Sequence, residues 1–124
     1  MKGAGAILVV DDNLRLCELA KRALDADGWT VEMATSRRAA LRAAARERFS
    51  VVLSDYAMPD GDGLRLLCEL ECLQPHCRLL LWSVDLPKTA ARNARALGVR
   101  VLPGKLLGDE LRAVARSAVA LHGG

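Results

Sequence analysis

Five short aliphatic runs recur along this chain, separated by longer segments in which apolar residues have helical spacing. The runs lie at residues 7–10, 30–34, 51–54, 79–82 and 99–102. Several are almost continuously apolar, which is typical of strands buried on both faces of a parallel sheet. Such a sheet needs helices on both faces, so the pattern indicates an α/β architecture.

The segments between and after these runs predict five helices. They are expected at residues 14–27, about 36–48, 64–73, 87–97 and 109–121. Gly28 and Gly98 follow two of them, as left-handed helix caps do, and Asp62 is a predicted N-cap. Because crossovers between parallel strands are right-handed, regular alternation leaves only a few doubly wound topologies. A chain of 124 residues suits a single domain.

Composition and charge exclude several classes of protein. With 52% apolar residues the chain is expected to fold. It has no apolar run near the roughly 20 residues of a membrane span, and its first residues lack the length of a secretory signal. We therefore expect a cytoplasmic protein without a membrane partner. A net charge of +3 is no nucleic-acid signature. The arginines of residues 37–48 suit a solvated helix face, with a phosphate or partner patch as the alternative.

The four cysteines form no C-x-x-C pair and lie at positions 17, 68, 72 and 77. They suit small thiols in a reducing compartment, and a metal or redox cluster is the less favoured interpretation because no histidine sits at ligand spacing. Trp82 ends one aliphatic run, where core packing is its expected role; a fluorescence reporter of the neighbouring site is the alternative.

Polar residues that suit phosphoryl chemistry follow the predicted strands. They are Asp11 and Asp12 after the first, Asp55 after the third, Ser83 after the fourth and Lys105 after the fifth. The carboxyl ends of parallel strands share one sheet edge, where open α/β sheets bind ligands. Clustered carboxylates repel one another. A bound Mg²⁺, which prefers oxygen ligands, would offset this repulsion. A carboxylate nucleophile, a divalent metal, a lysine and a hydroxyl suit phosphoryl transfer to aspartate.

Over residues 6–121 the chain resembles the response-regulator receiver domains of two-component signalling. The resemblance rests on the paired acids after the first strand, on Asp55 followed by Met58-Pro59 and Asp62-Gly63, and on Ser83 and Lys105. It implies one receiver domain over 1–124 without an effector domain. The implied fold is a five-stranded parallel sheet of flavodoxin-like order 2-1-3-4-5.

The resemblance also implies roles. Asp55 would accept a phosphoryl group from a sensor histidine kinase or a phosphotransfer protein. Asp12, Asp55 and the backbone carbonyl of Ala57 would ligate Mg²⁺, with Asp11 acting mainly through a metal-bound water. Ser83 and Lys105 would contact the phosphoryl group. The face formed by the fourth helix, the fifth strand and the fifth helix would then change, which would control a partner, a homodimer or an attached output such as transcription regulation.

Three positions depart from the family pattern. Leu106 stands where proline usually follows the lysine, so we expect a trans bond there and a differently aimed Lys105. Leu102 replaces an aromatic residue, and Val84 replaces a small residue beside Ser83. These departures motivate an alternative function, a phosphorylation-independent interaction module. A phosphatase is disfavoured because Ala57 stands where such enzymes need a second acid, so no enzymatic activity beyond self-phosphorylation and autodephosphorylation is expected.

Overall fold

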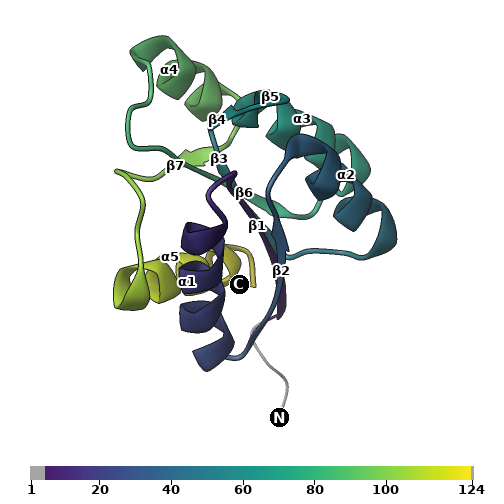
Figure 1. The fold of residues 1–124 in the computed structure, drawn as a ribbon, viewed down its shortest axis with the longest axis vertical. Helices are drawn as coiled ribbons and strands as arrows, with labels where there is room; N and C mark the ends of the chain where they lie inside the picture. The colour runs from purple at the N-terminus through teal and green to yellow at the C-terminus, as the bar shows by residue number, and fades with distance from the viewer. Residues whose placement is uncertain (1–4, 124) are drawn as a thin grey trace.

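The computed structural model describes residues 5–123 and confirms the α/β architecture (Figure 1). The five strands of the main sheet are β1 (Gly5–Val10), β2 (Trp29–Ala34), β3 (Val51–Asp55), β6 (Arg78–Trp82) and β7 (Arg100–Val101). They are parallel in the order β2-β1-β3-β6-β7, which is the predicted doubly wound order. The helices are α1 (Leu14–Ala26), α2 (Arg37–Arg46), α3 (Gly63–Leu73), α4 (Lys88–Ala96) and α5 (Gly108–Gly123).

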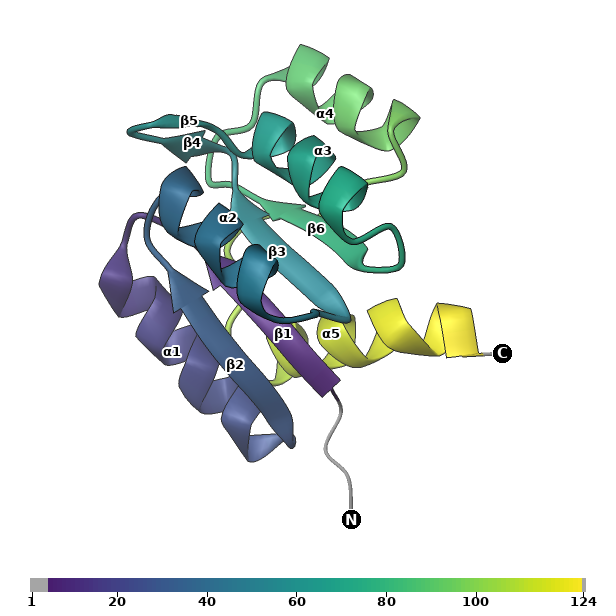
Figure 2. The same ribbon diagram turned by 90° about the vertical axis from the view of Figure 1, so that its right-hand side faces the viewer.

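The helices cover both faces of the sheet, as Figure 2 shows. Helices α1 and α5 pack on one face, where Cys17 and Leu111 join the inward side chains of β1, β3 and β6. Helices α2, α3 and α4 pack on the other, around Ala40, Leu66 and Ala94. This arrangement leaves the carboxyl ends of the strands open at one edge. Among the described residues, no helix has the length and apolar character needed to cross a membrane.

Local sequence accounts for most of the element boundaries. Ser36 and Asp62 cap α2 and α3 by accepting hydrogen bonds from Ala39 N (3.1 Å) and Arg65 N (2.7 Å). Gly28 and Gly98 adopt positive φ angles of 91° and 81°, as predicted for residues that close helices. The fifth strand is shorter than predicted, because only two of its residues pair with β6.

One element was not predicted from the sequence. The loop after β3 contains a small antiparallel hairpin of β4 (Ala57–Met58) and β5 (Gly61–Asp62). Pro59 and Asp60 form its turn, and Gly61 has a φ of 144° that strongly favours glycine. The loop that carries the predicted metal ligand Ala57 is therefore an ordered hairpin.

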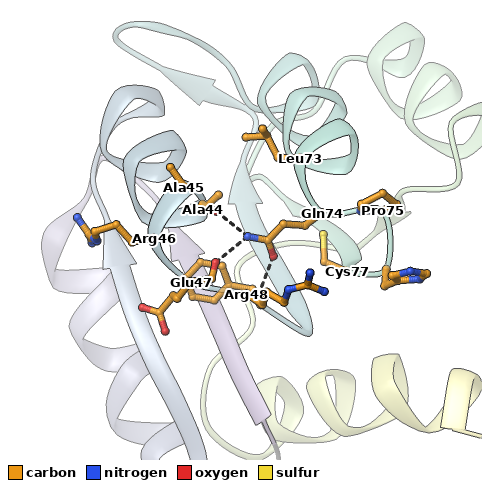
Figure 3. A pocket seen from close by; sticks show the side chains of 11 residues that line it. Ala44, Ala45, Arg46, Glu47, Arg48, Leu73, Gln74, Pro75 and Cys77 are labelled. Atoms are coloured by element: carbon orange, nitrogen blue, oxygen red, sulfur yellow. Dashed lines mark hydrogen bonds between the residues drawn. The ribbon is translucent and has the colours of Figure 1, made fainter.

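At the opposite edge of the sheet, the Gln74 side chain ties α3 to α2 and to the start of β3 (Figure 3). Its amide donates to Ala44 O (2.9 Å) and Glu47 O (2.7 Å), and its carbonyl accepts from Phe49 N (2.7 Å). The side chain lines a cavity of about 490 Å³ beside Pro75 and Cys77. These three hydrogen bonds give the Gln74 side chain a structural role at the edge of the sheet opposite to Asp55.

Replacing Gln74 with alanine is expected to lower the free energy of unfolding by about 1–3 kcal/mol, since three backbone groups lose their partner. Urea denaturation followed by circular dichroism measures the change. Glu71→Ala, at an exposed position on the same helix, is the control. Equal stabilities of the two variants would contradict this role.

Candidate functional site

Three aspartates converge at the carboxyl edge of the sheet. Asp11, Asp12 and Asp55 each offer a carboxylate oxygen within 4.8 Å of the others. Asp11 and Asp12 follow β1, and Asp55 ends β3 next to it in the sheet. Asp11 and Asp55 are buried, with 1% and 8% of their surface exposed, whereas Asp12 is exposed. The predicted cluster thus forms, and its oxygen donors suit a hard cation such as Mg²⁺.

Lys105 lies between the two buried aspartates. Its ammonium forms ion pairs with Asp11 Oδ2 and with Asp55 Oδ1, the latter at 3.2 Å. Burial raises the pKa of the Asp55 carboxyl; Lys105 opposes the rise, and the nearby charge of Asp11 adds to it. Asp11 is held in place by the Asn13 backbone N–H, which donates to its Oδ1 at 2.9 Å. The site therefore holds buried negative charge that one lysine balances only in part.

The hairpin beside Asp55 is anchored to α2. The Asp60 carboxylate accepts hydrogen bonds from the backbone N–H groups of Arg37 (2.9 Å) and Arg38 (3.1 Å), which lower the pKa of Asp60. The Arg37 guanidinium then makes a bidentate pair with Glu69 of α3, at 2.9 and 2.5 Å. The hairpin is consequently fixed to two helices, and Ala57 with it. Arg37, one of the arginines of residues 37–48, therefore has a structural role.

Gly63 allows the chain to turn tightly behind Asp55. Its N–H donates to Tyr56 O (2.5 Å), and a Cβ at this position would overlap with the main-chain carbonyl oxygen of Asp55. Ser54 Oγ also donates to that carbonyl, at 2.9 Å. Gly63 entered the sequence-based prediction only as part of the motif around Asp55. Glycines at positions 61 and 63 are the sequence feature that could have indicated this close approach.

The remaining predicted site residues lie near the cluster without joining it. Ser83 is half-buried directly after β6, and Ala57 is exposed in the hairpin. Within residues 5–123, neither makes a hydrogen bond to the three aspartates. Val84 is 83% exposed, so in this structure its side chain does not pack over Asp55.

The departures around Lys105 have a clear structural setting. No cis peptide bond occurs among the described residues, so the Lys105–Leu106 bond is trans as predicted, and the ammonium nevertheless reaches Asp55. Leu102 is buried and Leu106 partly buried in the core cluster that contains Trp82. Trp82 has no exposed surface, which confirms its predicted place in the core.

The cysteines are free thiols. Cys17 and Cys77 are buried, and burial raises the pKa of each to about 11. Cys68 is half-buried and Cys72 is exposed on α3. The buried pair matches the expectation of small core thiols.

Five arginines on α4, β7 and α5 divide into two groups. Arg92, Arg95 and Arg100 are exposed. Arg112 and Arg116 instead reach α1: Arg112 Nη1 donates to Ala23 O at 3.4 Å, and Arg116 pairs with Asp27 at 3.0 Å. The first group is exposed to a partner on that face, and Arg116 also keeps 59% of its side-chain surface exposed.

Comparisons with known proteins agree with this geometry. The model of the response regulator receiver domain family matches residues 7–107. The transcriptional regulatory protein ZraR of Escherichia coli is 31% identical over 115 residues, which cover 92% of this chain but 26% of ZraR. The chain spans less than a third of the length of the curated relatives it matches.

Two solved structures show the same fold. The signal receiver domain of an HD domain-containing protein from Pseudomonas fluorescens has a TM-score of 0.86 at 23% identity, over 100% of both chains. The response regulator TrrA of Thermotoga maritima, solved in complex with Mg²⁺ and BeF, has a TM-score of 0.78 at 24% identity, over 95% of this chain and 99% of that one. With the family match over most of its length, this chain belongs to the response-regulator receiver domains of two-component systems.

Proposed function

We propose that the chain is a phosphorylatable signalling switch in which Asp55 accepts a phosphoryl group from the phosphohistidine of a sensor histidine kinase or phosphotransfer protein. The observation that carries the proposal is the convergence of three aspartates and Lys105 at one sheet edge. Receiver domains are signalling modules, and we propose no activity for this one beyond its own phosphorylation and autodephosphorylation.

The proposed transfer starts from the Asp55 carboxylate. One of its oxygens attacks phosphorus, the bond from phosphorus to the donor imidazole breaks, and the imidazole leaves with the bonding electron pair. Lys105 already pairs with Asp55 Oδ1, so its ammonium is placed to follow the incoming charge onto the phosphoryl oxygens. The Ser83 hydroxyl, half-buried after β6, would donate a hydrogen bond to the same group.

The donor set fits a divalent cation. Asp12, Asp55 and the backbone carbonyl of Ala57 would hold Mg²⁺, with Asp11 acting through a bound water, and the ion would neutralise charge on the phosphoryl group. The exposure of Asp12 leaves the site open to solvent on its metal side. The complex of the related TrrA with Mg²⁺ and BeF supports this assignment.

The test is phosphorylation by acetyl phosphate, followed by intact-protein mass spectrometry. We expect the mass of one phosphoryl group to appear in the presence of Mg²⁺ and to be absent with EDTA. An unchanged mass in Mg²⁺ would contradict the proposal and would favour a phosphorylation-independent interaction module.

Mg²⁺ is also expected to stabilise the unmodified protein. At ten times its dissociation constant, a ligand that binds only the native state raises the free energy of unfolding by about 1.4 kcal/mol. Thermal unfolding with and without Mg²⁺ measures this. Mg²⁺ should stabilise the Asp12→Asn protein less than the wild type. Equal stabilisation of the two proteins would show that Asp12 is not a ligand.

The switch would act through the face formed by α4, β7 and α5. Strands β6 and β7 connect Ser83 and Lys105 to that face, and Arg92, Arg95 and Arg100 give it positive charge. We propose that this face binds a partner or a second copy of the chain, without direct binding of nucleic acid. Because relatives such as ZraR are transcriptional regulators, we propose a transcriptional output outside residues 1–124 and a cytoplasmic location.

A further inference from the structure

The Lys105 ammonium contacts an aromatic ring as well as carboxylates. Its Nζ lies 5.0 Å from the centroid of the Trp82 ring. Cation–π attraction acts within about 6 Å of a ring centroid and is strongest for tryptophan. The lysine side chain is 12% exposed and the tryptophan is fully buried, so water screens the contact only weakly.

The sheet places this ring beside the nucleophile. Trp82 ends β6 and is the register partner of Asp55 in β3. Its indole belongs to the core cluster under α1 and α5, which also contains Leu80 and Leu53 two residues earlier on the two strands. Because side chains two apart share a sheet face, Trp82 and Asp55 lie on the same face.

Lys105, by contrast, lies on a segment without regular structure. Residues 102–107 connect β7 to α5, and a lysine side chain on such a segment can populate many rotamers. Leu106 provides no ring to restrict the backbone as a proline would. The two carboxylates attract the ammonium, and the Trp82 ring contacts it in addition.

We propose that Trp82 is a positioning residue for Lys105, whose ring face holds the ammonium where it reaches both Asp55 and the incoming phosphoryl group. The inference rests on the proposed function and deepens it. Three contacts, to Asp11, Asp55 and the ring, define the ammonium position better than the two ion pairs alone. In this chain the aromatic contact fulfils a role that the residue after the lysine cannot.

The experiment compares rings of equal shape and different electron density. Wild-type protein and Trp82→Phe protein are each produced with tryptophan and with mono-, di- and trifluorinated tryptophan. Fluorine withdraws electron density from the ring and weakens cation–π attraction. In the Trp82→Phe protein only Trp29 carries fluorine, and it lies at the far end of the sheet, in register with Gly5. Trp82 Nε1 makes no hydrogen bond within the described part of the chain, so fluorination disturbs no such bond.

We expect the rate of Asp55 phosphorylation by acetyl phosphate at saturating Mg²⁺ to fall stepwise with fluorination in the wild type and to stay constant in Trp82→Phe. Complete loss of the ring, as in Trp82→Leu, should slow the reaction by roughly 2- to 30-fold, the factor that a cation–π contact corresponds to. The thermal unfolding midpoint of each fluorinated wild-type protein, measured in parallel, should not follow the same series.

The positioning role is overturned, while the proposed function stands, by either of two results. One is a wild-type phosphorylation rate that does not change with fluorination; the other is a Trp82→Phe rate that falls with fluorination as much as the wild-type rate does. A wild type that takes no phosphoryl group at all overturns the proposed function. Should Trp82→Phe fail to fold, Trp29→Phe protein replaces it, since Trp82 is then the sole tryptophan and the same stepwise fall is expected.

Discussion

Asp55→Asn protein is expected to take up no phosphoryl group from acetyl phosphate under conditions that label the wild type. An amide nitrogen or oxygen cannot serve as the carboxylate nucleophile. The two neighbouring carboxylates, Asp11 and Asp12, follow β1 rather than β3, and Asp11 is held by Lys105 and by the Asn13 N–H. Intact-protein mass spectrometry gives the answer directly. Labelling of the variant at the wild-type level would remove Asp55 from its proposed role.

The same substitution is expected to stabilise the metal-free protein. The pKa of Asp55 is raised in the folded state, above all by burial, so its ionised form near neutral pH opposes folding. Removing that charge raises the free energy of unfolding in EDTA. An increase in the free energy of unfolding is expected at this site only. Asp25 is an exposed carboxylate on α1 that pairs with Lys21 at 2.7 Å, so Asp25→Asn should leave stability unchanged or slightly lower. Both proteins are compared by urea denaturation.

Gly63→Ala is expected to have the largest effect on the fold around the site. The new Cβ would overlap with the Asp55 carbonyl oxygen and would lie 3.0 Å from Ser54 Oγ. A backbone carbonyl cannot rotate aside as a flexible side chain can, so β3 or α3 must move. Overpacking of this kind costs about 1–3 kcal/mol, and displacement of Asp55 should also slow phosphorylation.

Gly104→Ala is the matched control. Its Cβ would meet no atom within 4 Å, and neither glycine has a positive φ, so alanine suits both backbones and the clash with the Asp55 carbonyl is confined to position 63. Urea denaturation and the acetyl phosphate assay are applied to both. A Gly63→Ala protein as stable and as reactive as Gly104→Ala would show that the loop behind Asp55 is not tightly packed.

The parts of the fold that sequence alone predicted are those governed by local patterns. Val51–Leu53 reads as a buried strand whether or not its neighbours are known, and Asp62 caps α3 through a residue three positions away. The proximity of Asp11 and Asp55 was also predictable from the sequence, because the carboxyl ends of parallel strands share one edge of the sheet.

The parts that were missed depend on partners distant in sequence. Asp60 reaches α2 across 23 positions, and Gln74 reaches Ala44 across 30. Nothing in the local sequence around Gln74 identifies those carbonyl groups. The contact between Trp82 and Lys105 likewise depends on the path of the segment after β7, which has no periodic pattern to predict it.

The ion pair of Lys105 with Asp11 joins residues 94 positions apart, which bears on how the domain folds. Closing so long a loop is entropically costly until the intervening strands have paired, and contacts of this separation are characteristic of slow, high-contact-order folding. A nascent chain on the ribosome therefore lacks the proposed phosphoryl-accepting site until nearly the whole domain has been synthesised. Competence to receive a signal would then be among the last properties the domain acquires.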